Sequence, residues 1–396
     1  MVPVEWEVVT LEEVGLWMGG GTPSKANSKF WTGSIPWISP KDFSHSPHIQ
    51  DTEDHITEEA ITNSSTNAVL PSDIVIVTRS GVLRHRLPIA TVRGKRMAIN
   101  QDIKALSVYS AVDSDYVQYY IKGRDDEIRN ECVKAGTTVE SVDFNSLKKY
   151  PIPLPPLPEQ RRIAAVLSSV DGLLAGLDAL VAKKEAIKAG VMEELLTGGR
   201  RLAGYRSRSG VEWPVVRLGD YLKMQVGFPF SSIYFNSKSQ GIRLIKNRDL
   251  KTSDTKVFYT GPYDREFLVG KGDVLIGMDG DFTVCRWTGR DSLLNQRIGR
   301  LQIISADVNV DYIAFAIRPV LKDIEAKTAA TTVKHLSHND VEEIHLPLPP
   351  LPEQHAFAAV LSALDAELAA LRARRAKVAA VKAGLLGGLL SGEVRV

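Results

Sequence analysis

Cysteine is scarce in this sequence, and long apolar runs are missing. The 396 residues include two cysteines, Cys132 and Cys285, which lie far apart and have no metal-ligand spacing around them. No run of about 18 uncharged apolar residues occurs, so the sequence predicts no membrane-spanning segment. The first residues lack a basic region followed by an apolar run, so we expect no signal peptide. Together these absences favour a reducing, cytoplasmic location.

The sequence also lacks the common motifs of catalytic sites. It contains no HExxH, GxSxG, Walker or CxxC motif, and no GxGxxG motif follows a predicted strand. Residues 19–23 are rich in glycine but are predicted to form an ordinary loop. The eight histidines are scattered, and we interpret the nearest three, His45, His48 and His55, as part of a solvated loop. A turn at 277–282 carries two carboxylates without a third oxygen-rich position. We therefore expect no catalytic residue, no metal and no cofactor.

The sequence does contain an exact internal repeat of eight residues. Residues 153–160 read Pro-Leu-Pro-Pro-Leu-Pro-Glu-Gln, and residues 347–354 repeat them letter for letter, at an offset of 194 residues. The following residues match at the same offset, with Ala-Ala-Val-Leu-Ser at 164–168 and again at 358–362. Solenoid repeats have periods of about 20–50 residues, so this period indicates a duplicated domain with its helix.

The repeated Pro box predicts the start of a long helix. Its alternating prolines hold the backbone extended, and Pro158 suits the first helical position. A PxxP ligand for an SH3-like partner is the alternative interpretation. Downstream, apolar residues recur every three or four positions, which predicts two helices of about 34 residues, ~50 Å long, that pack on each other. Gly190 and Gly384 predict fraying nearby. The predicted contact residues of these arms are Ile163, Val170, Leu177, Ile187, Phe357, Leu364, Leu371 and Val378.

The remaining sequence predicts two strand-rich domains. Short apolar runs at 35–38 and 74–77 are bounded by turn residues, as strands are, and residues 115–121 are predicted to be helical. After a basic link at 200–201 the pattern restarts. Val-Glu-Trp at 4–6 recurs at 211–213, Asn-Gln at 100–101 recurs at 295–296, and Thr-Thr-Val at 137–139 recurs at 331–333.

We therefore expect an α+β protein in which two mixed α/β domains have a pseudo-two-fold arrangement. Two long antiparallel helices that form a coiled coil separate the domains. The predicted order is a first domain at 1–150, a Pro box with its arm at 151–200, a second domain at 201–346, and a second Pro box with its arm at 347–396.

Charge is concentrated locally, although the whole chain has a net charge of only +2. Between residues 79 and 104 seven basic residues stand against one acidic residue, and between 238 and 256 six stand against two. Solvated loops are the simplest interpretation, but the recurrence in both halves favours contacts with nucleic-acid phosphates and base edges. The candidate contacts of the first domain are Lys25, Lys41, Arg79, Ser80, Arg84, His85, Arg86, Arg93, Lys95 and Arg96. Those of the second domain are Lys238, Gln240, Arg243, Lys246, Asn247, Arg248, Lys251, Lys256, Arg286 and Arg290.

Several motifs make the chain resemble the specificity subunit of type I restriction–modification systems, the HsdS family. They are Gly-Gly-Thr-Pro-Ser at 20–24, Phe-Trp at 30–31, Ile-Pro-Trp-Ile-Ser-Pro-Lys-Asp-Phe at 35–43, Gly-Phe-Pro-Phe at 227–230 and both Pro boxes. The resemblance covers essentially the whole chain. Gly-Gly-Thr-Pro occurs only in the first domain, and the first arm lacks the short tandem repeat that some members carry, so no spacer length can be borrowed from a relative.

The resemblance implies a non-catalytic subunit whose two target-recognition domains bind a split, asymmetric sequence in double-stranded DNA. It also implies two methyltransferase (modification) subunits and ATP-dependent restriction subunits as partners, with no membrane. Adenine methylation and DNA cleavage would belong to those partners. Two alternatives are a methyltransferase with its own recognition region, whose characteristic motifs are missing, and a helical scaffold that does not touch DNA.

Two further expectations concern how such a chain would work. Residues that both domains share, such as Asn100 and Asn295, should shape the fold, because shared residues cannot carry a difference in target. The arms should set the gap between the two half-sites. On this interpretation, four residues inserted after Leu196 would change the gap and leave the half-sites unaltered.

Overall fold

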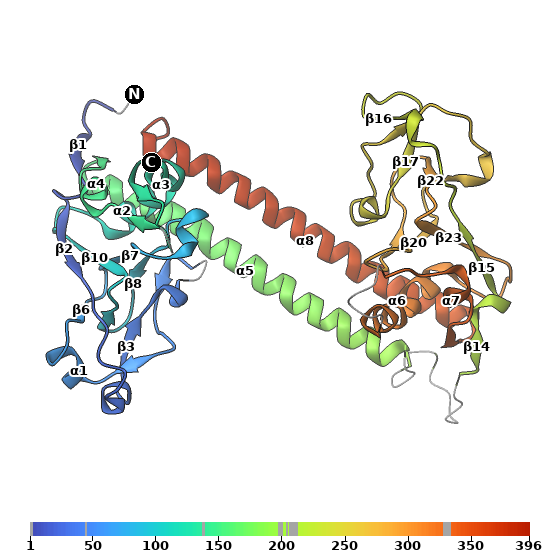
Figure 1. Ribbon diagram of the computed structural model, residues 1–396, viewed down its shortest axis with the longest axis horizontal. Coiled ribbons are helices and arrows are strands. Elements are labelled where there is room, and N and C mark those ends of the chain that lie inside the picture. Colours follow the sequence, from blue (N-terminus) through green and yellow to red (C-terminus); the bar gives the residue numbers. More distant parts are fainter. Residues whose placement is uncertain are drawn as a thin grey trace. The chain divides into compact units, whose positions relative to one another are not determined.

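The computed structural model describes residues 3–43, 46–136, 139–196, 201–202, 205, 213–327 and 334–396. The chain divides into two compact units, of which the first combines Met1–Asp178 with Ala373–Val396 and the second is Ala179–Arg372. Each unit holds one mixed domain and one part of each of two long helices, α5 (Leu157–Leu196) and α8 (Leu351–Ser391) (Figure 1). The units therefore cut across the four segments suggested by the sequence, because each long helix contributes to both.

The domain of the first unit has two main sheets, beside the two-stranded pairs of β1 (Glu7–Thr10) with β13 (Pro151–Leu154) and β11 (Val133–Lys134) with β12 (Ser141–Val142). The larger has the strand order β2 (Gly15–Gly19), β10 (Ile103–Val108), β7 (Ile74–Val77), β8 (Ile89–Val92) and β4 (His48–Ile49). The smaller has the order β5 (His55–Ile56), β3 (Ile35–Ile38), β9 (Met97–Ile99) and β6 (Asn67–Val69). The strands predicted at 74–77 and 35–38 are confirmed as β7 and β3. All four residues of β7 are buried, which explains its unbroken apolar sequence.

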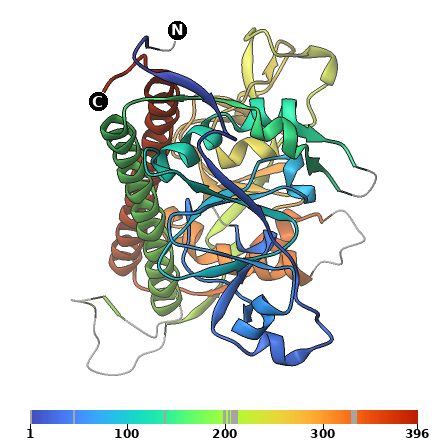
Figure 2. The same cartoon turned by 90° about the vertical axis from the view of Figure 1, so that its left-hand side faces the viewer.

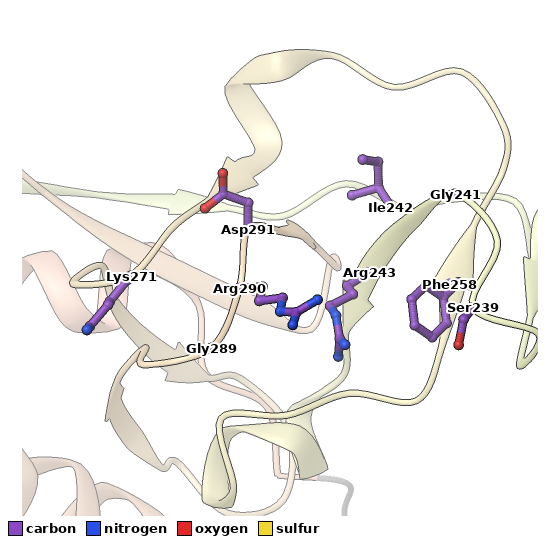
Figure 3. A pocket seen from close by; sticks show the side chains of 9 residues that line it. All are labelled: Ser239, Gly241, Ile242, Arg243, Phe258, Lys271, Gly289, Arg290 and Asp291. Atoms are coloured by element: carbon purple, nitrogen blue, oxygen red, sulfur yellow. The ribbon is translucent and has the colours of Figure 1, made fainter.

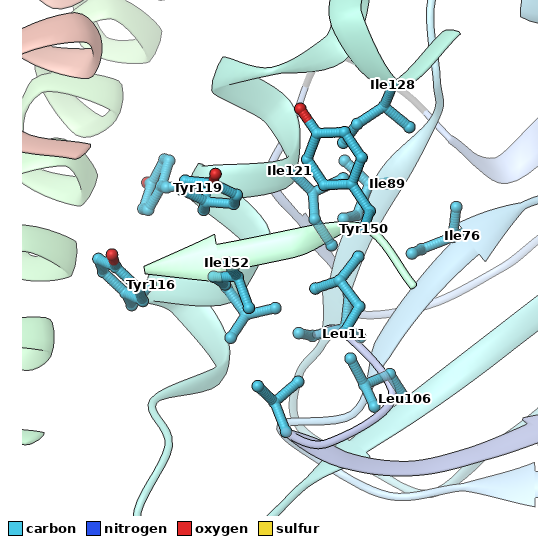
Figure 4. Packing of buried hydrophobic residues seen from close by; sticks show 14 of the residues in the cluster. Leu11, Ile76, Ile89, Leu106, Tyr116, Tyr119, Ile121, Ile128, Tyr150 and Ile152 are labelled. Carbon is cyan, nitrogen blue, oxygen red and sulfur yellow. The ribbon is translucent and has the colours of Figure 1, made fainter. Parts of the chain in front are cut away.

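Helix α2 (Ser114–Gly123) confirms the helix predicted at 115–121, and it packs between the larger sheet and the long helices (Figure 4). The Tyr116 hydroxyl donates to the Pro153 carbonyl at 2.6 Å, and the Tyr119 hydroxyl donates to Asp171 of α5 at 2.9 Å. Burial raises the pKa of both phenols, so they remain neutral donors. The remaining elements of this unit are α1 (Glu58–Thr62), α3 (Asp125–Cys132) and α4 (Phe144–Lys148).

The domain of the second unit also has two main sheets, beside the two-stranded pair of β14 (Val215–Arg217) and β24 (His345–Pro347). One has the order β15 (Leu222–Val226), β23 (Ile298–Ile303), β20 (Val274–Gly277) and β21 (Val284–Arg286). The other has the order β16 (Phe235–Asn236), β18 (Phe258–Tyr259), β17 (Ile242–Ile245), β22 (Ser292–Leu294) and β19 (Leu268–Val269). The remaining elements are α6 (Val310–Lys327) and α7 (His338–Glu342). Short 3₁₀ helices lie at Ser28–Trp31, Pro40–Asp42, Gly81–Arg84, Leu218–Asp220, Ser232–Tyr234, Asn247–Lys251 and Arg265–Phe267.

The strand order shows that the duplication extends through both domains. The order β2-β10-β7-β8 of the first unit recurs as β15-β23-β20-β21, and the parallel pair β3–β9 recurs as β17–β22. A glycine also recurs at the same place in both domains, where two backbone segments approach each other closely. A Cβ at Gly20 would lie 2.2 Å from the Asn100 carbonyl oxygen, and a Cβ at Gly227 would lie 2.2 Å from the Asn295 carbonyl oxygen. The α+β class and the repeated domain are confirmed. The Thr-Thr-Val repeat and His45 include residues that lie outside the described part of the chain.

The long helices exceed the predicted 34 residues. Helix α5 has 40 residues and α8 has 41, which corresponds to about 60 Å each at 1.5 Å per residue. The predicted fraying is wrong, because α5 continues through Gly190 and α8 through Gly384. Leu195 is buried in the core of the second unit and Leu389 in that of the first, so packing outweighs the low helix propensity of glycine.

The predicted apolar stripe is only partly correct. Ile163, Leu177 and Phe357 are buried, and Val170, Leu364, Leu371 and Val378 are partly buried. Ile187 is 41% exposed, so its assignment to the contact between the helices is wrong. It lies seven residues after Leu180, which is also exposed, whereas the half-buried Lys184 and Lys188 reach carboxylates of α8. Ion pairs thus occupy positions that the spacing assigns to apolar contact.

These ion pairs fix the direction of the two helices within each unit. In the first unit Asp171 pairs with Lys382 and Asp178 with Arg375. In the second unit Lys184 lies 2.8 Å from Glu367, and Lys188 pairs with Asp365. Later residues of α5 meet earlier residues of α8, so the helices are antiparallel, as predicted.

By length and composition α5 is apolar enough to cross a membrane, which the sequence analysis did not anticipate. One such helix is weak evidence for a membrane span. Two of its acidic residues pair with cations of α8 in the first unit: Asp171 with Lys382, and Asp178 with Arg375. We therefore regard α5 as one half of a helix pair.

Candidate nucleic-acid interface

The repeated Pro box anchors each long helix to its own domain. Gln160 accepts a hydrogen bond from the Asp113 amide at 2.8 Å and donates to the Pro155 carbonyl at 2.8 Å. Gln354 accepts from the Asn309 amide at 2.8 Å and donates to the Asp307 carbonyl at 2.9 Å and the Pro349 carbonyl at 2.8 Å. Both side chains are buried. This geometry confirms that the box is a helix entry, and it ties the helix to the loop that precedes α2 or α6.

The glutamate of each box makes a second repeated contact. Glu159 lies 2.6 Å from Arg395, whose guanidinium is 5.9 Å from the Trp6 ring. In the second unit Glu353, which is fully buried, lies 2.6 Å from Arg201, and Arg201 is 5.0 Å from the Trp213 ring. The carboxylate raises the pKa of Arg201.

The sequence analysis missed this Glu-Arg-Trp cluster and treated Arg201 only as part of a basic link. A signal was present, because Arg201 and Arg395 are separated by the same offset of 194 residues as the two boxes. Arg201 follows α5 and forms an ion pair with Glu353 in the first turn of α8. Arg395 follows α8 and forms an ion pair with Glu159 in the first turn of α5.

Polar residues shared by the two domains shape turns. The Asn100 side chain accepts from the Asp102 amide at 3.0 Å, and Asn295 accepts from the Arg297 amide at 3.3 Å. Asp73 accepts from the Leu70 amide at 2.7 Å. These contacts support the expectation that shared residues are structural.

Most of the candidate cations in the first domain have acidic neighbours. Lys41 lies 2.9 Å from Glu53 and 3.0 Å from Asp54, and both carboxylates raise its pKa. The other pairs are Arg84 with Glu140, Arg93 with Asp115, Lys95 with Asp51 and Arg96 with Glu58. The positive run in the sequence is therefore largely neutralised in space.

The remaining candidates of the first domain differ in their surroundings. Arg79 is exposed and has no ion pair within the described part of the chain, and Lys25 lies 5.9 Å from the Trp31 ring. Arg86 donates to the Phe43 carbonyl at 2.9 Å. Ser80 caps the Gly81–Arg84 helix, and the exposed His85 ends it.

The candidates of the second domain include more cations without an acidic neighbour. Lys238, Lys256 and Arg290 are exposed, and no ion pair involves them among the residues that the structure describes. Four others are paired: Arg243 with Asp254, Arg248 with Asp249, Lys251 with Asp281 and Arg286 with Asp311.

The polar candidates of this domain serve local contacts. Lys246 stacks 5.1 Å from the Phe235 ring, and Asn247 donates to the Asp279 carbonyl. The backbone of Gln240 bonds to the Asn236 side chain, whereas its own side chain is exposed.

An open cavity of about 800 Å³ in the second domain is lined by three basic residues, Arg243, Lys271 and Arg290, of which Lys271 extends away from the two arginines (Figure 3). Its other lining residues are Ser239, Gly241, Ile242, Phe258, Gly289 and Asp291. An adjoining cavity of about 370 Å³ shares the same three cations. Because Arg243 already pairs with Asp254, two cations without an ion pair among the described residues, Lys271 and Arg290, remain beside the lining carboxylate of Asp291, which favours an anionic ligand such as a phosphate. Sequence reasoning missed Lys271, because it stands alone outside the basic run.

The two carboxylates of the turn at 277–282 already have basic partners. Asp279 accepts from Arg297 and lies 2.8 Å from His335, and Asp281 lies 2.6 Å from Lys251, which lowers the pKa of that carboxyl group. Within the described ranges, no group of three His, Cys, Asp or Glu side chains is placed to hold a metal ion.

Comparisons with known proteins agree with this duplicated plan. The family model described as the type I restriction modification DNA specificity domain matches residues 3–187 and again residues 210–380. The specificity subunit of the Escherichia coli type I restriction enzyme EcoR124I/EcoR124II is 42% identical over 171 residues, which span 43% of this chain and 41% of that protein. The MjaIX specificity subunit of Methanocaldococcus jannaschii is 25% identical over 100% of this chain and 95% of its own length.

A solved structure shows the same fold. The S subunit of the type I restriction–modification system from M. genitalium has a TM-score of 0.66 at 16% identity, covering 98% of this chain and 96% of that one. Because the family model matches twice and covers most of the sequence, this chain belongs to the type I restriction modification DNA specificity domain family.

Proposed function

We propose that this chain is the DNA-recognition subunit of a type I restriction–modification complex, and that each domain reads one part of a bipartite, asymmetric target. The observation that carries the proposal is the family match, which covers a domain and its helical arm twice over. The two domains repeat one strand order but carry different loops. Two related scaffolds with different surfaces suit the recognition of two different half-sites.

The cations without acidic neighbours are the best candidates for DNA contact. In the second domain they include Lys271 and Arg290 of the 800 Å³ cavity, and in the first domain Arg79. Each such cation releases counterions when it neutralises a phosphate, which makes affinity depend on salt. The paired cations of the first domain, such as Lys41 and Arg96, must exchange a carboxylate for a phosphate and should contribute less.

The catalytic steps belong to partner subunits in this proposal. The sequence carries no catalytic motif, and its relatives are named specificity subunits. The chain would assemble in the cytoplasm with two methyltransferase subunits and with restriction subunits. Leu180 and Ile187, exposed on one side of α5, offer an apolar surface on which a helix of such a partner can pack.

Sequencing the methylated sites in cells that carry this chain with its methyltransferase subunits tests the proposal. We expect methylated adenine in one bipartite motif, and no methylation by the purified chain alone. Methylation by the chain alone would favour a methyltransferase. Partner assembly without a DNA gel shift at low and moderate salt would favour a scaffold.

A further inference from the structure

The ion pairs between α5 and α8 fall into two classes. Asp171–Lys382 and Lys188–Asp365 follow the internal repeat, because the offset of 194 residues turns Asp171 into Asp365 and Lys188 into Lys382. A pair made of two copies of one helix would contain the same contacts. These pairs therefore cannot tell α5 from α8.

Three other pairs break the repeat. In Lys184–Glu367 the offset replaces both charges by apolar residues, Val378 and Leu173, so this pair is lost without repulsion when identical helices meet. The other two pairs behave differently. Asp178 lies 2.9 Å from Arg375 in the first unit, and Glu185 pairs with Arg372 in the second. At the offset of 194 residues, Arg372 stands where α5 has Asp178. The same place in the repeat thus carries opposite charges in the two helices.

This inversion makes pairs of identical helices unfavourable. If a second copy of α5 took the place of α8, Glu185 would face Asp178 of that copy, since Asp178 corresponds to Arg372. If a second copy of α8 took the place of α5, Arg372 would face Arg375 of that copy. Charges beside a helix seam set partner choice in this way, because like charges penalise the wrong pair.

We infer that Asp178, Glu185, Arg372 and Arg375 form a charge code that pairs α5 with α8 and rejects a second copy of either helix. The four side chains are 45% to 59% exposed, so their attraction adds little to stability in itself. Their effect lies in discrimination, because they keep the two unlike halves together. This inference does not depend on DNA binding.

Charge exchange within the full chain tests the code. In the variant E185R/R372D, the intended contact between α5 and α8 keeps opposite charges. Position 185 of α5 would now attract Asp178 of a second copy, and position 372 of α8 would attract Arg375 of a second copy. The variant D178R/R375D also keeps opposite charges in its contact between α5 and α8. Position 178 of α5 would now attract Glu185 of a second copy, and position 375 of α8 would attract Arg372 of a second copy. The fourfold variant that combines both exchanges restores repulsion between identical helices.

Each chain is unfolded and refolded at one concentration, and its oligomeric state is measured by size-exclusion chromatography with light scattering. A symmetric dimer contains four altered contacts, so at about twofold per contact we expect a dimer-to-monomer ratio roughly 16-fold higher in each double variant. The fourfold variant should return to the ratio of the wild-type chain. The matched control E185D/R372K keeps every sign and should also behave like the wild-type chain.

Circular dichroism establishes that each variant has refolded, and the two double variants provide independent tests if one of them does not fold. Equal ratios in all folded variants would overturn the inference. A fourfold variant that dimerises as strongly as the double variants would overturn it too, because the effect would then follow substitution rather than the sign of the charges.

Discussion

Asn100 shows how a residue shared by both domains acts at the scale of a single side chain. It is buried, and its oxygen accepts the Asp102 amide at 3.0 Å. Replacement by alanine leaves that amide without its acceptor, so we expect Asn100→Ala to lower the free energy of unfolding by about 1–2 kcal/mol. Urea unfolding measures the change, with the exposed Asn63→Ala as control. The methylated motif should stay the same, and an altered motif with unchanged stability would assign Asn100 to base recognition.

Lys271 and Arg290 provide a prediction about the candidate DNA contact. Both line the 800 Å³ cavity, and neither has an ion pair within the described part of the chain. Replacing both with alanine should lower the slope of log affinity against log salt by about 1.8, since each phosphate contact contributes about 0.9. Gel-shift titrations on the DNA target measure the slope. The control is Lys251→Ala, which removes a cation that is already paired with Asp281. An unchanged slope would place DNA on another surface.

The state of each cation could not be predicted from the sequence. Arg84 belongs to the basic run at 79–104, but its partner Glu140 lies 56 residues farther along the chain and is brought close by the fold. The guanidinium lowers the pKa of that carboxyl group. Lys271 shows the opposite case, because it is isolated in the sequence and joins Arg243 and Arg290 only in the folded domain. The sequence therefore predicted that basic residues would be concentrated on a surface, but not which of them would lack an acidic partner in the folded domain.

At the scale of elements, the glutamine of each Pro box holds a helix to its domain. Replacing Gln354 with leucine keeps the volume but leaves the partly buried Asn309 amide without its acceptor and two carbonyls without their donor. We expect Gln354→Leu, and likewise Gln160→Leu, to lower the free energy of unfolding by about 2–4 kcal/mol. Urea unfolding measures both, and the exposed Gln240→Leu is the control. A loss equal to that of the control would mean that water replaces the lost hydrogen bonds.

The long helices were predictable in kind but not in detail. The Pro box and the apolar periodicity predicted where α5 starts, since a helix entry has a local sequence signal. The side that meets α8 has no such local signal. Ile187 fits the apolar spacing, but it is exposed, while Lys188 reaches Asp365. Which apolar positions are buried depends on the partner helix and on the domain under each end.

At the scale of the whole molecule, both ends of each long helix are fixed to a domain core. In α5, Ile163 packs in the core of the first unit and Leu195 in the core of the second. In α8, Phe357 packs in the core of the second unit and Leu389 in the core of the first. An insertion after Leu196 would lie beyond the last packed residue of α5. This anchoring changes the expectation from the sequence, and we now predict that four residues inserted there leave the gap between half-sites unchanged.

Lengthening both helices together is the change that should alter the gap. Seven residues inserted after Val181 and seven after Leu371 preserve the helical phase within about 20° and add roughly 10 Å. At ~3.4 Å per base pair, we expect the methylated motif to keep both half-sites and gain about three base pairs between them. Sequencing of methylated sites measures the motif. Altered half-sites with an unchanged gap would mean that the helices do not set the spacing.

The duplication itself could be predicted from the sequence, because chance does not produce an eight-residue repeat at half the chain length with matching residues after it. The loops between the shared anchors could not, since their contacts depend on partners distant in sequence. Asn236, which holds the backbone of Gln240, and Asp51, which pairs with Lys95, are examples. These loops are also where a difference in target must lie.

The last turns of α8 have a consequence for the order in which the chain matures on the ribosome. Leu389 and Leu390 are buried in the same core as Trp6 and Tyr119, and a Cβ at Gly123 would touch Leu390. The domain that is translated first therefore cannot close its core until Leu389 and Leu390 have been made. Its apolar surface stays open during the seconds that translation of the second half requires. We expect such a nascent chain to depend on a chaperone that covers the first domain, and a ribosome that stalls just before Leu389 would leave the first domain incomplete rather than the second.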